Sequence, residues 1–254
     1  MGPLLSIKDL TVVVGGKALV DGVSFDVPQG KIVAIAGGSG SGKTTIGLTI
    51  LRLLPPALGI KQGSIVFEGQ DLLGLSREEM RQQRGARIGM IFQEPLSAFD
   101  PLFTIGGQLD EALAAHTQLS NTQRRDKILD TLSEAGLSDP PRAYNSFPHQ
   151  LSGGMRQRAM VALACICGPS LIIADEPTSS LDLTLQVKIM ELFSLLKKKN
   201  VSVLLIAHDL GMISRVADEL IILRQGQMVE KGPTGKVMTQ PVHDYTKALI
   251  EAFQ

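Results

Sequence analysis

A glycine-rich loop between an apolar strand and a helix constrains the fold of this chain more than any other stretch. Residues 37–44 read GGSGSGKT and match G-x-x-x-x-G-K-[ST], with Gly37, Gly42, Lys43 and Thr44 at the fixed positions. The apolar run KIVAIA precedes the loop and TTIGLTILRLL follows it, which predicts a strand, a loop and a helix in that order. Such a loop closes backbone N–H groups around phosphates, so the sequence predicts a nucleoside triphosphate site.

The side chains of the loop have distinct expected roles. The Lys43 ammonium would bridge the phosphates and the Thr44 hydroxyl would bind Mg²⁺. A glycine-rich turn without a ligand is the alternative, and the strand, the lysine and the helix together argue against it. The predicted nucleotide-binding residues here are Gly37, Gly38, Ser39, Gly40, Ser41, Gly42, Lys43, Thr44 and Thr45.

The composition excludes several classes of protein. The 254 residues are 44% hydrophobic, which allows a full core, and 25 basic residues balance 25 acidic ones. This neutral balance gives no support to a nucleic-acid-binding surface. No apolar run reaches about 18 residues, so no membrane span is expected. The N-terminus lacks the apolar segment of a signal peptide. Cys165 and Cys167 are expected to be buried free thiols in a reducing cytosol.

The periodicity of the chain changes twice. Short alternating runs near the N-terminus, such as LLSIKDLTVVV and ALVDGVSFDV, predict an antiparallel layer. Residues 95–168 have helical periodicity and predict an inserted helical lobe. Apolar strands and helices then alternate, which indicates a mostly parallel α/β sheet. The sequence thus predicts one domain, with a core and β layer in residues 1–94 and 169–254.

Polar side chains follow three further strand-like runs. LIIADE ends in Asp175, expected to hold Mg²⁺ through water, and Glu176, expected to polarise the attacking water as general base. Without the loop upstream, this acidic pair could simply cap a helix. His208 follows VSVLLIA within expected reach of the γ-phosphate. Gln93 ends IGMIFQ and is, taken alone, an ordinary polar residue at a strand end.

The run LSGGMRQR discriminates most between functions. Ser152, Gly153 and Gly154 precede a helix and would form a second anion-binding helix N-terminus. A helix cap would explain Ser152 but not the whole run. Two such termini far apart in one chain suggest ATP sandwiched between two subunits.

Together these motifs resemble the nucleotide-binding subunit of an ATP-binding-cassette (ABC) transporter over essentially the whole chain. GGSGSGKTT resembles the phosphate loop, Gln93 the Q-loop glutamine and LSGGM the signature motif. LIIADEP resembles the magnesium and base segment, SSLD with Asp182 the D-loop, and His208 the switch histidine. The resemblance implies an α/β P-loop NTPase fold: a RecA-like core, an antiparallel β layer and the helical lobe.

The resemblance also implies the activity and its partners. ATP and Mg²⁺ are the expected cofactors, with Thr44, Gln93 and Asp175 at the metal and Glu176, His208, Gln93 and Lys43 as catalytic residues. Two subunits would dimerise head to tail, each ATP lying between one chain's phosphate loop and the other chain's signature motif. A heterodimer with a related second ATPase is expected. It would act at the cytoplasmic face of the membrane on two transmembrane permease subunits, served indirectly by an extracytoplasmic solute-binding protein.

The sequence departs from the family pattern at the adenine. The family usually places an aromatic residue in an early loop to stack on the base, and here alignment puts Val14 at that position. The loss of stacking would weaken nucleotide affinity by about 1–2 kcal/mol, by analogy with stacking of bases on aromatic side chains. Weaker discrimination between ATP and GTP is therefore expected.

Three further runs resemble the oligopeptide, dipeptide and nickel importer branch: QEPLSAFDPLFTIGGQLDEAL, FPHQLSGGMRQR and QPVHDYTKALIEA. The short tail without a cysteine cluster, the SAFDP form and the missing aromatic favour import of nickel or a metal chelate. A di- or oligopeptide importer is the alternative. A soluble non-transport ABC ATPase is more remote, because residues 94–150 offer no long coiled-coil insertion.

Overall fold

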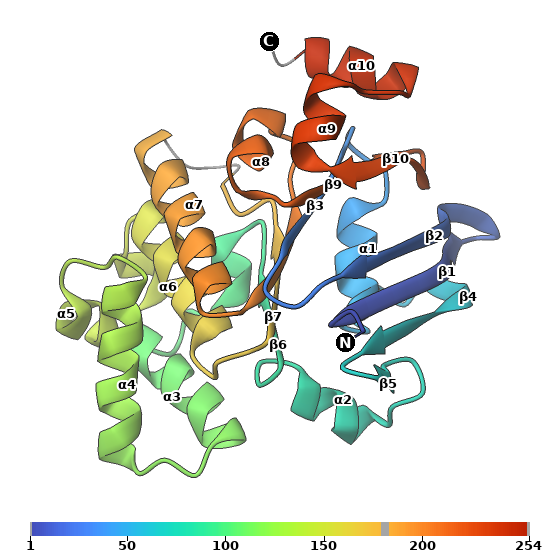
Figure 1. Ribbon diagram of the computed structural model, residues 1–254. Coiled ribbons are helices and arrows are strands. Elements are labelled where there is room, and N and C mark those ends of the chain that lie inside the picture. The colour runs from blue at the N-terminus through green and yellow to red at the C-terminus, as the bar shows by residue number, and fades with distance from the viewer. Residues whose placement is uncertain (1, 179–182, 253–254) are drawn as a thin grey trace. The chain divides into compact units, whose positions relative to one another are not determined.

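The computed structural model describes residues 2–178 and 183–252, which form two compact units (Figure 1). The first unit combines Met1–Arg81 with Phe193–Gln254, and the second is Gln82–Leu192. The predicted helical lobe, residues 95–168, lies within the second unit, and its limits as a separate lobe stay a prediction. Within the described residues, no helix combines the length and the apolar character needed to cross a membrane.

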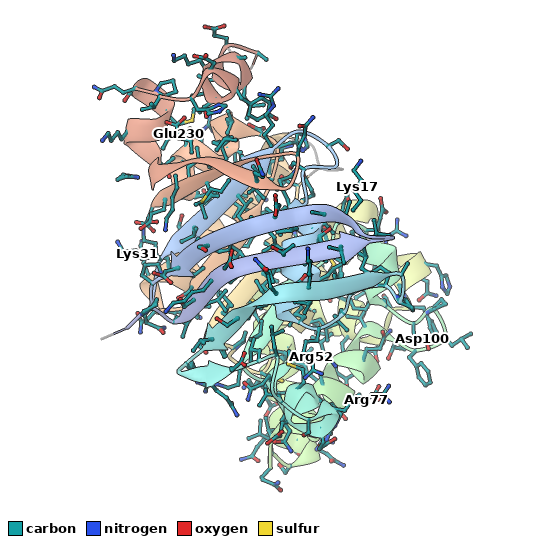
Figure 2. All side chains as sticks on the ribbon, turned by 90° about the vertical axis from the view of Figure 1, so that its right-hand side faces the viewer. Lys17, Lys31, Arg52, Arg77, Asp100 and Glu230 are labelled. Carbon is teal, nitrogen blue, oxygen red and sulfur yellow. The ribbon has the colours of Figure 1, made fainter. Side chains whose placement is uncertain are left out.

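The first unit contains the predicted antiparallel layer. Its strands are β1 (Leu5–Val14), β2 (Lys17–Val27), β4 (Leu58–Phe67) and β5 (Gln70–Asp71), in the order β2-β1-β4-β5. Gly15 and Gly16 join β1 to β2 with φ of 53° and 83°. Positive φ at both central residues matches the turn that suits the twist of a two-residue hairpin. In Figure 2, Lys17 at this hairpin and Lys31 lie at opposite ends of the layer.

A largely parallel sheet forms the core of the first unit. Strand β3 (Ile32–Gly37) lies between β8 (Ser202–Ile206) and β9 (Glu219–Arg224), parallel to both. Strand β10 (Gln227–Pro233) pairs antiparallel with β9, and the two form a hairpin. All residues of β3 and β8 are buried, as expected for strands covered on both faces. The helices of this unit are α1 (Lys43–Ile50), α8 (Leu210–Val216), α9 (Thr234–Thr239) and α10 (Asp244–Glu251).

The second unit pairs two parallel strands with a group of helices (Figure 1). Strand β6 (Ile88–Ile91) pairs with β7 (Leu171–Asp175). The helices are α3 (Ile105–His116), α4 (Asn121–Glu134), α5 (Pro140–Asn145) and α6 (Gly153–Cys165), with short 3₁₀ turns at η1 (Pro95–Ala98) and η2 (Pro148–Gln150). Two more helices, α2 (Arg77–Gln83) and α7 (Leu183–Lys198), cross from one unit to the other along the chain.

Local contacts explain where these helices begin. The Ser120 hydroxyl accepts from the Gln123 N–H, and the Gln123 side chain accepts from the Ser120 N–H, so a capping box starts α4. Arg124 then donates to both carboxylate oxygens of Asp110 at 2.7 and 3.1 Å, which ties α4 to α3.

Cys165 and Cys167 are free thiols, as the sequence predicts, but both are only half-buried. The prediction that they are buried was therefore too strong.

Candidate functional site

The glycine-rich loop leaves β3 in close contact with the neighbouring strand. Gly37 ends β3 with φ of 152°, and a Cβ on it would lie 2.1 Å from the Leu223 carbonyl oxygen of β9. Gly42 precedes α1 with φ of 97°, and a Cβ there would lie 2.8 Å from the Leu19 carbonyl oxygen. Only glycine fits such close approaches of backbone at positive φ. Both fixed glycines of the motif therefore have a structural cause.

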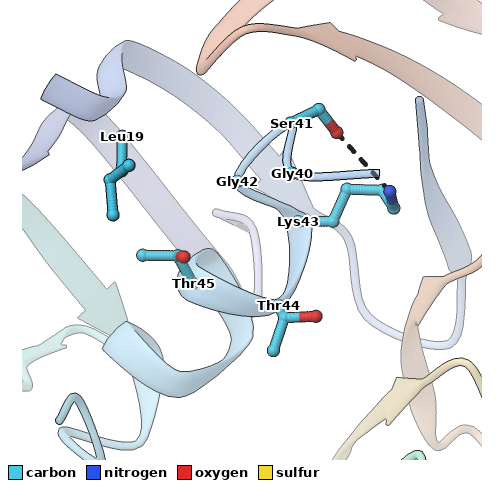
Figure 3. Close-up of a pocket in the computed structure, with 7 residues that line it drawn as sticks. All are labelled: Leu19, Gly40, Ser41, Gly42, Lys43, Thr44 and Thr45. Atoms are coloured by element: carbon cyan, nitrogen blue, oxygen red, sulfur yellow. Dashed lines mark hydrogen bonds between the residues drawn. The ribbon is translucent and has the colours of Figure 1, made fainter. Parts of the chain in front are cut away.

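Lys43 is buried, and its ammonium is fixed within the loop that precedes it. The Nζ atom donates to the carbonyl oxygens of Gly37 at 2.9 Å and Gly38 at 3.0 Å, and to the Ser41 hydroxyl at 3.5 Å (Figure 3). The loop itself is held to the β9–β10 turn, because the Gly226 N–H donates to the Ser41 carbonyl at 3.1 Å. The loop thus presents a positioned cation at the start of a helix.

A cavity of about 200 Å³ opens beside this loop. It is lined by Leu19, Gly40, Ser41, Gly42, Lys43, Thr44 and Thr45. Backbone N–H groups at a helix N-terminus, a lysine and two threonine hydroxyls suit an anionic phosphate chain, so these residues fit a nucleotide. Leu19 on β2 points into the cavity near Thr45 (Figure 3). Sequence reasoning considered Val14 for the base and missed Leu19, which lies beside the loop because its backbone closely approaches Gly42.

His208 lies at the same edge of the first unit as the loop. Strand β8 runs parallel to β3 with Ile206 opposite Ile35, and the Ala207 N–H donates to the Ile35 carbonyl at 3.2 Å. Two residues after Ile35 comes Gly37, and two residues after Ile206, just beyond the end of β8, comes His208. His208 is exposed at this edge, where ligands bind in open α/β sheets.

The second unit brings Gln93, Asp175 and Glu176 together in the same way. Strands β6 and β7 are parallel with Ile91 opposite Ala174, so the residues that follow them emerge at one edge. Asp175 is buried, Glu176 is half-buried and Gln93 is exposed. Glu176 has φ of 48°, a left-handed conformation that non-glycine residues rarely adopt. Strain of this kind is concentrated at functional sites, where the surrounding structure compensates for it.

The signature residues begin α6 in the second unit. The Ser152 hydroxyl accepts from the Met155 N–H at 3.3 Å, so Ser152 serves as the N-cap of the helix. Gly153 has open space where a Cβ would be. Buried Gln157 donates from Nε2 to the Pro177 carbonyl at 2.6 Å and ties α6 to the chain just after Glu176. Sequence reasoning missed Gln157, because it lies between Arg156 and Arg158 and looks like one more polar residue of the helix.

The site residues therefore form two groups. The first unit holds the loop and His208, and the second holds Gln93, Asp175, Glu176 and the start of α6; Asp182 lies outside the described residues. Mg²⁺ prefers oxygen ligands and binds through one or two carboxylates together with phosphates. The Thr44 hydroxyl, the Asp175 carboxylate and the Gln93 amide oxygen have that chemistry. Among described residues, no three His, Cys, Asp or Glu side chains are grouped as a metal site of their own.

Known proteins resemble this chain over nearly its whole length. The family model described as ABC transporter matches residues 20–179. The dipeptide transport ATP-binding protein of Bacillus subtilis is 45% identical over 98% of this chain and 76% of its own length. The oligopeptide transport ATP-binding protein of the same organism is 41% identical over 97% of this chain and 71% of its own. A solved dimeric ATP-binding cassette with ADP and Pi superimposes with a TM-score of 0.81, at 28% identity, over 91% of this chain and 98% of that one.

Proposed function

This chain belongs to the ABC transporter family as an ATP-hydrolysing cassette, and from that premise we propose that it powers import of di- or oligopeptides. The observation that supports peptides as the cargo is the 45% identity to a dipeptide transport ATP-binding protein over 98% of this chain. The preference for nickel drawn from the sequence has no support among these relatives. It rested on the short tail, the SAFDP form and the missing aromatic, which are features of an ATPase that does not contact the cargo.

In the proposed mechanism, the first unit binds the nucleotide. The loop N–H groups and the Lys43 ammonium hold the β- and γ-phosphates, and Leu19, which lines the cavity beside the loop, contacts the nucleotide. Phosphoryl transfer depends mainly on positioning and on neutralising charge. Lys43 supports both, because its carbonyl partners already fix the ammonium at the loop.

The second unit supplies the general base and most of the metal ligands, and Thr44 and His208 of the first unit complete the chemistry in this proposal. Thr44, Asp175 and Gln93 would hold Mg²⁺, which neutralises developing charge on the phosphates when bound. Glu176 takes a proton from the attacking water, and His208 contacts the γ-phosphate. General bases of this kind typically contribute about 10²–10⁴-fold to the rate. The left-handed backbone of Glu176, with φ of 48°, supports this role, since strained backbone of this kind is concentrated at functional sites.

Dimerisation completes the proposed site. Each ATP would lie between one loop and Ser152, Gly153 and Gly154 of a second cassette, with Asp182 also contributing. The dimeric state of the superimposed cassette supports this arrangement. The second cassette is a related chain in our proposal, so the working pair is a heterodimer. ATP favours the closed pair over the open one, and hydrolysis reverses that preference.

An exposed apolar turn supports contact with membrane subunits. Leu102 and Phe103 follow η1 and are 78% and 59% exposed. The Gln108 side chain accepts from the Asp100 N–H at 2.9 Å and donates to the Asp100 and Phe103 carbonyls at 2.9 and 3.0 Å, which fixes the turn. We assign this surface to the two permease subunits, which a solute-binding protein supplies. The chain would then be peripheral to the membrane, at its cytoplasmic face.

Uptake in the native cell tests the cargo. A strain carrying only Glu176→Gln is compared with wild type for uptake of a labelled dipeptide and of labelled nickel. Dipeptide uptake should fall to the background of a deletion strain while nickel uptake holds. Glu191→Gln, an exposed position on α7, is the matched control and should change neither. Loss of nickel uptake with dipeptide uptake intact would reverse the assignment.

A further inference from the structure

The C-terminal helix reaches back to the phosphate loop through one tyrosine. The Tyr245 hydroxyl oxygen, in the first turn of α10, accepts a hydrogen bond from the Gly38 N–H at 2.9 Å. The Gly38 carbonyl in turn accepts from the Lys43 ammonium at 3.0 Å. The N–H group of Gly38 thus bonds to Tyr245, and the carbonyl group of Gly38 bonds to Lys43. The hydroxyl and the ammonium are linked through a single residue.

The contact with Tyr245 explains why a glycine occupies position 38. Unlike Gly37, Gly40 and Gly42, Gly38 does not have the positive φ that requires glycine. A Cβ at Gly38 would instead lie 3.2 Å from the Tyr245 hydroxyl oxygen, tighter than ordinary van der Waals contact. Glycine here leaves room for the tyrosine, so the loop and the C-terminal helix fit each other.

Neighbouring elements fix Tyr245 in place. The Arg224 guanidinium, at the end of β9, lies over the tyrosine ring at 5.1 Å from its centre. The His243 Nδ1 atom accepts from the Tyr245 N–H at 3.0 Å and caps α10. The Glu230 carboxylate on β10 accepts hydrogen bonds from the N–H groups of Val242 at 2.8 Å and His243 at 3.0 Å. The tyrosine is therefore set by β9, by β10 and by its own helix cap.

The Glu230 carboxylate is suited to this anchoring. Partial burial on its own would raise the pKa of Glu230, but the Thr246 side chain and the N–H groups of Val242 and His243 lower it below its ordinary value. The carboxylate is therefore ionised at neutral pH and accepts the hydrogen bonds of the Val242 and His243 N–H groups as a charged group, which strengthens them.

We propose that Tyr245 is a positioning residue for the phosphate loop, fixing Gly38 and, through the Gly38 carbonyl, the Lys43 ammonium. This rests on the proposed role of Lys43 at the ATP phosphates. Tyr245 does not touch the reacting atoms in this proposal. The C-terminal helix becomes part of the nucleotide site, so displacement of α10 weakens ATP binding.

The test is Tyr245→Phe in the full chain, which removes only the hydroxyl. The KM for ATP should rise about 3- to 10-fold, the range expected for one neutral hydrogen bond. The kcat should stay within about twofold, because Lys43 contacts the phosphates in both the ground state and the transition state. Tyr144→Phe is the matched control: Arg125 lies over that ring at 4.9 Å, but the residue is on α5 in the second unit. It should change neither constant.

Two further measurements separate positioning from general support of the fold. The melting temperature without nucleotide should be the same in Tyr245→Phe and Tyr144→Phe. Gly38→Ala, which crowds the hydroxyl, should also raise the KM, and its effect should shrink in the Tyr245→Phe background, where the oxygen is gone. Additive effects would contradict a shared contact.

The outcomes separate this proposal from the proposed function. An unchanged KM in Tyr245→Phe, with wild type hydrolysing ATP, would overturn the role of Tyr245 alone. A fall in kcat that matches a lower melting temperature would also overturn it, since the residue would then be structural. A wild-type chain that binds no ATP would overturn the proposed function, and this inference with it.

Discussion

The two units place their site residues at the carboxyl ends of parallel strands but hold them in different ways. In the first unit, backbone contacts fix the loop: the Gly37 and Gly38 carbonyls hold Lys43, and the Ser41 carbonyl accepts from Gly226. In the second unit, the proposed catalytic groups are side chains on exposed or strained backbone, with Gln93 exposed and Glu176 at φ of 48°.

This difference separates binding from chemistry. A site made of backbone N–H groups and glycines can hold phosphates with little movement, and it is sensitive to any added side-chain atom. A site made of side chains can lose one functional group without loss of fold. Substitutions in the loop of the first unit should therefore affect binding or stability, whereas isosteric substitutions of the catalytic side chains in the second unit should affect turnover.

Glu176→Gln is the strongest test of this separation between binding and chemistry, because it should have the largest effect. The amide has nearly the size of the carboxylate but cannot take a proton, so the kcat of the purified chain should fall by about 10²–10⁴-fold. ATP affinity should be retained, because the loop that binds the phosphates lies in the other unit. Steady-state ATP turnover and calorimetric titration with ATP measure the two quantities. Retained turnover would remove Glu176 as the general base.

The loop can be predicted well from the sequence because the residues that form it are close together along the chain. Gly37 and Gly42 are required by close backbone approach, Lys43 follows at a fixed spacing, and both flanking elements are strongly apolar. The residues after β6, β7 and β8 could also be placed, because parallel strands present their carboxyl ends at one edge. Local pattern and strand direction are enough for both.

Contacts between distant segments could not be predicted in this way. Tyr245 and Gly38 are 207 positions apart, and Gln157 meets Pro177 across 20. Each is an ordinary residue for its local structure, so the pattern does not record its partner. The cargo is a similar case, because a cassette that never contacts the solute carries no side chains selected to bind it. The preference for nickel rested on such indirect features.

Gly37→Ala tests whether close backbone contacts in the loop of the first unit stabilise the fold. The added Cβ would lie 2.1 Å from the Leu223 carbonyl oxygen, at φ of 152°. Backbone strain and overpacking together should lower the free energy of unfolding by about 2–4 kcal/mol. Gly235→Ala on α9 is the matched control, because its Cβ would meet open space, and it should be neutral or slightly stabilising. Urea unfolding of both variants provides the measurement, and equal midpoints would contradict the close approach.

The smallest expected effect lies at the opposite end of β3 from the loop. There Asp218 accepts from the Ile32 N–H at 3.0 Å and from the ammonium groups of Lys197 at 2.7 Å and Lys31 at 3.3 Å. Burial raises the pKa of Asp218, but these hydrogen bonds and the Lys197 charge lower it below its ordinary value. Because the folded pKa is the lower one, the unfolded chain binds the proton more readily. The stabilisation is therefore full above the ordinary pKa of about 3.9 and is lost as the pH falls through the folded value.

Asp218→Asn should consequently cost about 0.5–1 kcal/mol of unfolding free energy at pH 7, a modest amount because solvent screens this partly exposed group. As the pH falls below about 4, the gap between variant and wild type should narrow, and it should close once the pH is below the folded pKa, since wild type then loses the same interaction. Asp26→Asn, at an exposed position on β2, is the matched control and should show no gap. The KM for ATP and the kcat should be unchanged, because this network lies at the amino end of β3 and the loop at its carboxyl end. A rise in the KM would mean that the two ends of β3 are coupled, and that binding in the first unit depends on more than the backbone of its loop.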